Sequence, residues 1–120
     1  MTFLCYDRCS TCKKAQQWLD DRGVSYTRRE IKDEPPTEAE LRAWQKASCL
    51  PLGRFWNTSG QQYRALGLKD KLADMSEDAQ FQLLASDPML VRRPILIGDD
   101  FVRPGFKHPE WEEVLGWQMK

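Results

Sequence analysis

The sequence predicts a single α/β domain, residues 1–120, with a mixed central sheet, and three observations predict it. An apolar strand pattern at residues 2–6 is followed at once by a helical pattern, and a second strand pattern covers residues 24–31. At about residues 37–86 the chain carries helical patterns without a convincing strand. Two short strand patterns and a helix close the chain, so the expected order is β-α-β, a helical insertion, and β-β-α.

Length, charge and cysteine count exclude several classes of protein. A chain of 120 residues is long enough for one core and too short for two. Eighteen basic and eighteen acidic residues cancel, so no global charge favours nucleic acid or a membrane surface. Four cysteines are too few for a disulfide-stapled secreted domain. No apolar run approaches the ~20 residues of a membrane span, and the chain enters a strand at once, so we expect a cytoplasmic protein without a signal peptide.

The first half of the chain predicts a β-α-β unit. The helix after the first strand should end at Gly23, which follows a polar run and suits the position after a helix C-terminus. The short return to the second strand implies parallel strands joined by a right-handed crossover. Residues 33–36 then break the chain, and Thr37 with Glu40 forms a capping box that begins the insertion. We expect its first helix to bury one face, which carries Leu41, Trp44 and Ala47.

The remaining elements follow from local signals. Within the insertion we expect a short helix holding Phe55 and Trp56, a turn at residues 57–60, and helical turns carrying Tyr63, Leu66, Leu68, Phe81, Leu83 and Leu84. Residues 95–97 are apolar and β-branched and should form a central strand, joined by a turn to an antiparallel strand at residues 101–103. A final helix should begin at His108 and Pro109. This is the element order of a thioredoxin-like fold with a helical insertion.

The most informative motif is the C-x-x-C turn between the first strand and the first helix. The N–H groups and positive dipole end of the helix should stabilise a thiolate at Cys9, and Cys12, one turn further, is placed to resolve a mixed disulfide. Two alternatives remain open, half of a zinc site and an inert pair of reduced thiols. Zinc usually needs four ligands, and only Cys5, Cys49 and His108 remain, scattered along the sequence. We expect no metal.

Pro94 should complete the site from the other end of the chain. In thioredoxin-like folds a cis proline begins the third strand and packs opposite the C-x-x-C turn, and a proline at the first position of a strand loses no ladder hydrogen bond. Arg93 would then lie near Cys9, where a guanidinium stabilises a thiolate or binds an oxyanion. The alternative is that Arg92 and Arg93 are solvated charges at the edge of a strand, which we favour for Arg92.

Four segments carry a family resemblance that covers nearly the whole chain. They are residues 6–15 (YDRCSTCKKA), 34–37 (EPPT), 66–68 (LGL) and 92–95 (RRPI). The sequence resembles the ArsC arsenate reductase family, including its Spx and MgsR branch. The resemblance implies a thioredoxin-like fold with Cys9 as the nucleophile and Arg93 and Arg103 as two of three oxyanion-binding arginines. The third arginine should fall near Asn57, where this chain has none. The expected substrate-binding set is Arg93, Arg103, Ser10, Thr11 and Asn57.

Two functions follow from the resemblance. The enzyme would be an arsenate reductase-type oxidoreductase with no bound cofactor, whose Cys9 mixed disulfide is cleared by Cys12 or by glutathione with glutaredoxin or thioredoxin. The extra thiol at Cys12 resembles the Spx branch, in which the pair acts as a disulfide switch. A protein of that kind would be a transcriptional regulator that binds the RNA polymerase α subunit without contacting DNA. In both cases we expect Cys5 and Cys49 to be packed residues and His108 to be a surface or capping residue.

Overall fold

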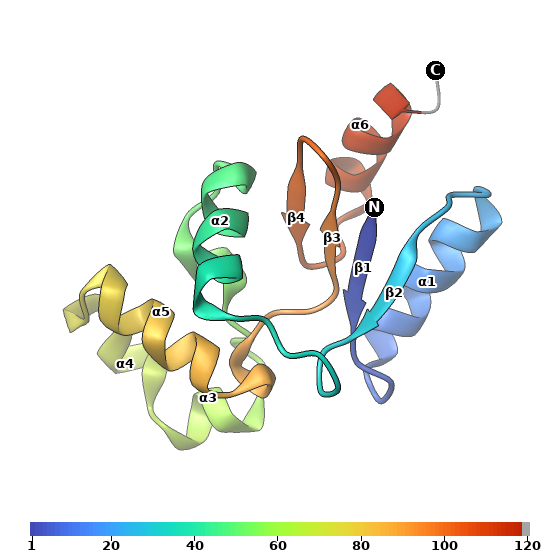
Figure 1. The fold of residues 1–120 in the computed structure, drawn as a ribbon. Helices are drawn as coiled ribbons and strands as arrows, with labels where there is room; N and C mark the ends of the chain where they lie inside the picture. Colours follow the sequence, from blue (N-terminus) through green and yellow to red (C-terminus); the bar gives the residue numbers. More distant parts are fainter. Residues whose placement is uncertain (119–120) are drawn as a thin grey trace.

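The computed structural model describes the backbone of residues 1–118 and the side chains of residues 1–116, and its centre is a four-stranded sheet with the order β2-β1-β3-β4 (Figure 1). The strands are β1 (Thr2–Cys5), β2 (Thr27–Glu30), β3 (Ile95–Ile97) and β4 (Val102–Pro104). β1 pairs in parallel with β2 and antiparallel with β3, and β3 pairs antiparallel with β4. The mixed sheet and the thioredoxin-like class predicted from the sequence are confirmed.

One face of the sheet is covered by α1 (Ser10–Asp21) and α6 (His108–Gln118). Alternate residues of a strand point to opposite faces, so Phe3 and Leu96 pack on this side, with Trp18 and Trp111 from the two helices. The indole N–H of Trp111 donates to the Gly105 carbonyl at 3.0 Å, which satisfies its only polar group inside the core. Within the described part of the chain no helix is both long and apolar enough to cross a bilayer.

The opposite face carries the helical insertion, which lies to one side of the sheet in Figure 1. Its elements are α2 (Glu38–Ser48), η1 (Leu52–Phe55), α3 (Gln61–Ala65), α4 (Leu68–Lys71), η2 (Leu72–Asp74), α5 (Glu77–Ser86) and η3 (Pro88–Leu90). Leu4 and Ile95 point into this layer and are fully buried there with Leu84. The short helices are therefore held by a core of their own against the sheet, because helices of four or five residues do not persist alone.

Ion pairing and capping fix where the insertion begins. The Thr37 hydroxyl accepts from the Glu40 N–H at 3.1 Å, and the Glu40 carboxylate accepts from the Thr37 N–H at 3.1 Å, which is the expected capping box. The same carboxylate receives both terminal nitrogens of Arg29, at 2.7 and 2.9 Å. This bidentate pair ties the end of β2 to the start of α2.

Three details differ from the sequence expectation. β2 begins at Thr27 rather than at residue 24, because the Val24 N–H still donates to Leu19 at the end of α1. Ser48, not Ala47, completes the buried stripe of α2, since its hydroxyl is satisfied by the Gln45 carbonyl at 2.7 Å. Leu66 is 40% exposed and does not join the core, because α3 ends just before it.

Truncation of a buried leucine in the insertion should destabilise the protein far more than truncation of an exposed one. Leu84→Ala removes a fully buried side chain and should lower the free energy of unfolding by about 2–5 kcal/mol. Leu66→Ala is the matched control and should change it by no more than about 0.5 kcal/mol. Urea unfolding monitored by tryptophan fluorescence measures both values, and equal losses would contradict the packing described here.

Candidate functional site

Cys9 lies at the start of α1, at the N-cap position, with an extended backbone. Its N–H donates to the Tyr6 carbonyl at 3.0 Å, which closes the turn after β1, and its carbonyl accepts from the Lys13 N–H at 3.1 Å, which begins the helix. The Cys9 thiol is partly exposed, whereas Cys12 is only 3% exposed. The turn therefore presents one sulfur to solvent and buries the other.

The surroundings of Cys9 favour its thiolate. A hydrogen bond from the Cys12 thiol is the largest influence and, with the first-turn N–H groups and the Arg93 charge, lowers the pKa of Cys9 to about 5. Partial burial opposes this shift and is outweighed. A pKa this low favours the thiolate form of Cys9 at neutral pH.

Cys12 is held in the opposite protonation state. Its hydrogen bond to Cys9 and its burial both raise the pKa of the Cys12 thiol far above the ordinary value. The Tyr6 N–H lies 3.4 Å from the Cys12 sulfur and donates toward it. The pair consists of an exposed thiolate and a buried thiol proton donor, which are the protonation states that a nucleophile and its resolving partner require.

The other two cysteines lie outside this pair. Cys5 is buried in β1, where burial raises the pKa of its thiol to about 11, and its S–H points to the Arg29 carbonyl at 3.8 Å. Cys49 is not packed as expected from the sequence, because it lies exposed at the end of α2, with a left-handed backbone (φ 57°). All four cysteines are free. In the described part of the chain no group of three or more histidine, cysteine or acidic side chains could hold a metal ion.

Arg93 and Pro94 lie directly before β3, and Arg93 lines the same cleft as Cys9. The Arg93–Pro94 peptide bond is cis. The Arg93 guanidinium lies 4.9 Å from the centre of the Tyr6 ring, and its charge contributes to the low pKa of Cys9. Its contacts with the Met89 and Val91 carbonyls are long, 3.4 Å each, and its Nε has no partner. The guanidinium is therefore held near Cys9 with donor capacity to spare.

A cleft of about 250 Å³ opens over Cys9. Its walls come from the first turn of α1, the segment after η1, the segment before β3 and the segment after β4, and the lining residues are Cys9, Thr11, Asn57, Ser59, Arg92, Arg93, Gly105, Phe106 and Lys107. Of the residues predicted from the sequence, Cys9, Thr11, Asn57 and Arg93 meet here. Ser10 does not line the cleft, although it begins α1 next to Cys9.

For Arg103 and Arg92 the structure differs from the sequence expectation. Arg103 does not line the cleft, because its guanidinium turns to the Val102 and Ser48 carbonyls, at 3.0 and 3.4 Å. Arg92, for which the sequence favours a solvated charge at the edge of a strand, is instead half-buried and lines the cleft. The two consecutive arginines before Pro94 were the sequence feature that indicated cations at this site. The direction of each side chain, however, also depends on hydrogen-bond partners far away in the sequence.

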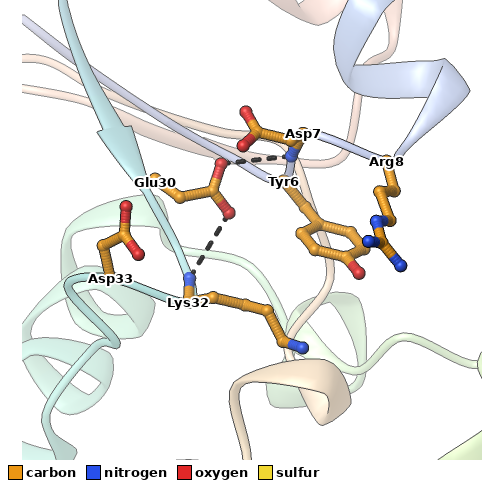
Figure 2. A pocket seen from close by; sticks show the side chains of 6 residues that line it. All are labelled: Tyr6, Asp7, Arg8, Glu30, Lys32 and Asp33. Carbon is orange, nitrogen blue, oxygen red and sulfur yellow. Dashed lines mark hydrogen bonds between the residues drawn. The ribbon is translucent and has the colours of Figure 1, made fainter.

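A second pocket, of about 240 Å³, flanks the loop that leads into the C-x-x-C turn (Figure 2). In it the Glu30 carboxylate accepts from the Asp7 N–H at 3.1 Å and from the Lys32 N–H at 3.5 Å. Asp7 also pairs with Arg28. The end of β2 thereby fixes the loop that carries Cys9, a role for Glu30 that the strand pattern alone did not suggest.

Comparison with known proteins identifies relatives along nearly the whole chain. The sequence model of the ArsC family matches residues 4–114. The uncharacterized protein YusI of Bacillus subtilis is 46% identical over 113 residues, which cover 94% of this chain and 96% of YusI. The regulatory protein MgsR of the same organism is 27% identical, covering 92% of this chain and 86% of MgsR. The structure of a possible arsenate reductase from Streptococcus mutans is 44% identical, covers 92% of this chain and 96% of that one, and superposes with a TM-score of 0.82.

The pH profile of Cys9 alkylation should report the thiolate and the influence of Arg93. Only the thiolate reacts with iodoacetamide, so the rate should reach its plateau above the pKa of about 5 and fall below it. Arg93→Ala removes a positive charge and should move the midpoint upward by roughly 0.5–1 pH unit. Arg64→Ala, an exposed arginine on α3, is the control. Mass spectrometry of the peptide containing Cys9 gives the rates, and an unchanged midpoint in Arg93→Ala would exclude Arg93 from the site.

Proposed function

The chain belongs to the ArsC family, and from this membership and the geometry at Cys9 we propose that it is a thiol–disulfide redox protein. Cys9 is the nucleophile and Cys12 the resolving thiol. The observation that carries the proposal is the asymmetry of the pair, in which the partly exposed Cys9 has a lowered pKa and the buried Cys12 a raised one.

The proposed reaction consists of two successive thiol–disulfide exchanges. The Cys9 thiolate attacks one sulfur of a substrate disulfide, a bond forms between Cys9 and that sulfur, and the other sulfur leaves as a thiolate. Cys12 then loses its proton and attacks Cys9 in the mixed disulfide, which releases the second substrate thiolate. The protein ends with a Cys9–Cys12 disulfide, and the substrate has gained two electrons and, from Cys12 and solvent, two protons. Glutathione with glutaredoxin, or thioredoxin, is the reductant we propose for the next cycle.

Arsenate is a second electron acceptor for the same pair. The relative from Streptococcus mutans, described as a possible arsenate reductase, supports this choice. Arsenate would take two electrons from two thiols and lose one oxygen as water, leaving arsenite and a disulfide. Arg93 beside Cys9 is the residue that would hold the oxyanion during attack.

A regulatory role is the alternative, and the similarity to MgsR supports it. In this role, oxidation of Cys9 and Cys12 would alter the exposed turn at the start of α1, and with it the surface offered to a protein partner such as the RNA polymerase α subunit. Both roles use the same cysteine pair, so the partner or acceptor distinguishes them.

Oxidation should join Cys9 to Cys12. After treatment with a small disulfide and alkylation of the remaining thiols, mass spectrometry should find that linkage in the wild-type protein and in Cys49→Ser. Cys12→Ser should instead accumulate a mixed disulfide at Cys9, because the resolving thiol is missing. A linkage from Cys9 to Cys5 or Cys49, or a Cys9 that stays free, would refute the redox proposal.

A measurement of arsenate-dependent NADPH consumption distinguishes the enzymatic role from the regulatory one. NADPH consumption is measured with arsenate, glutathione, glutathione reductase and glutaredoxin. Turnover that depends on arsenate and disappears in Cys9→Ser supports the enzyme. Absence of turnover, together with binding of the purified polymerase α subunit to only one redox form, supports the regulator.

A further inference from the structure

The cleft over Cys9 holds more cationic than anionic groups, and the Cys9 thiolate is the one anion among its lining residues. Arg92, Arg93 and Lys107 line it, and no acidic residue does. Among the described side chains, none of the ion pairs includes any of these three residues. Partly buried cations without a counter-ion are costly, and an anionic ligand would offset that cost.

Arg92 is held in place by contacts that leave its outer face free. Its Nε donates to the Trp56 carbonyl at 3.1 Å, and one terminal nitrogen donates to the Thr58 hydroxyl at 3.3 Å. Its backbone N–H donates to the Phe55 carbonyl at 2.8 Å, so the anchor involves both the main chain and the side chain. A guanidinium has five N–H donors, and these contacts use two of them.

Gly105 makes room for this arrangement. A Cβ atom at Gly105 would lie 3.1 Å from Cδ of Arg92, which is tighter than nine in ten real Cβ contacts, and Gly105 has φ +74°. The aliphatic stem of Arg92 therefore lies directly against the backbone after β4. Burial lowers the pKa of Arg92, as does the nearby charge of Arg54.

The hydrogen bond to Thr58 also places the Arg92 guanidinium beside the segment that follows η1 in the cleft wall. Thr58 lies between Asn57 and Ser59, both of which line the cleft. The structure brings the Arg92 guanidinium to the segment from the other end of the chain.

We propose that Arg92 is the second anion-binding guanidinium of the Cys9 cleft and that, with Arg93, it holds an oxyanion group of the molecule that reacts with Cys9. The proposal rests on the proposed function, because it specifies the charge of that molecule. Two sources share the required chemistry, an inorganic tetrahedral oxyanion and a carboxylate carried by a disulfide. Arg103 is not part of this pair.

Two alkylating reagents of nearly equal size measure the charge preference directly. Iodoacetate carries a carboxylate and iodoacetamide is neutral, and with each the Cys9 thiolate forms a carbon–sulfur bond while iodide leaves. The rate with iodoacetate is divided by the rate with iodoacetamide. In this ratio the intrinsic reactivity of the thiolate cancels, and the preference of the cleft for a negatively charged reagent remains. Arg92→Gln should lower this ratio by about tenfold, the loss of one charge-assisted contact. Arg64→Gln is the matched control and should leave it unchanged.

Arg92→Lys separates ligand binding from a structural role. It keeps the charge, so its ratio should stay near the wild-type value. If Arg92→Lys and Arg92→Gln instead lose the iodoacetamide rate equally, or if Arg103→Gln lowers the ratio and Arg92→Gln does not, the proposal is overturned. If iodoacetamide fails to modify wild-type Cys9 at neutral pH, it is the redox function that fails.

Two further measurements identify the source of the anion. Inorganic arsenate or phosphate should slow iodoacetamide modification if the cleft binds a tetrahedral oxyanion. Glutathione disulfide should react with Cys9 faster than its tetraester, whose carboxylates are masked, if the cleft binds a carboxylate. Either effect supports the proposal when Arg92→Gln removes it, and persistence of both effects in Arg92→Gln contradicts it.

Discussion

The interaction between the Cys12 thiol and the Cys9 thiolate, at the start of α1, is the one on which the proposed chemistry of this protein depends. It is the largest influence on both thiols, lowering the pKa of Cys9 and raising that of Cys12. Together with the first-turn N–H groups, the Arg93 charge and the burial of Cys12, this interaction favours a thiolate at Cys9 and a protonated thiol at Cys12. It requires one sulfur at the open end of a helix and the other buried one turn later, which is the geometry that the start of α1 provides.

The rest of the fold positions the two cysteines and forms the cleft around Cys9. Glu30 at the end of β2 holds the loop before Cys9, and the segment before β3 brings Arg92 and Arg93 beside it. The helical insertion adds the wall around Asn57, which is fastened to the same segment because the Asn57 N–H donates to the Leu90 carbonyl at 2.8 Å. Residues from distant parts of the chain therefore form one cleft, and the insertion is a part of the site.

Local sequence patterns predicted the elements well and the cleft only in part. The strand, C-x-x-C turn and helix that contain Cys9 are consecutive, so periodicity and the turn motif located them together. The directions of Arg92 and Arg103 could not be predicted in this way. Arg92 donates to the carbonyl of Trp56, far away in the sequence, and Arg103 donates to the carbonyls of the adjacent Val102 and the distant Ser48. The same limit explains the start of β2, which is delayed by a hydrogen bond back to α1.

The most direct test of this account is the pKa of Cys9 when the residue at position 12 is changed. It can be measured from the ultraviolet absorbance of the thiolate as the pH is raised, with Cys9→Ser as the blank. Cys12→Ser keeps a hydrogen-bond donor and should leave the pKa of Cys9 low, whereas Cys12→Ala removes the donor and should raise it toward the ordinary value of a cysteine. An equally low pKa in Cys12→Ala would show that the helix and the arginine suffice, and that the Cys12 hydrogen bond is not what activates Cys9.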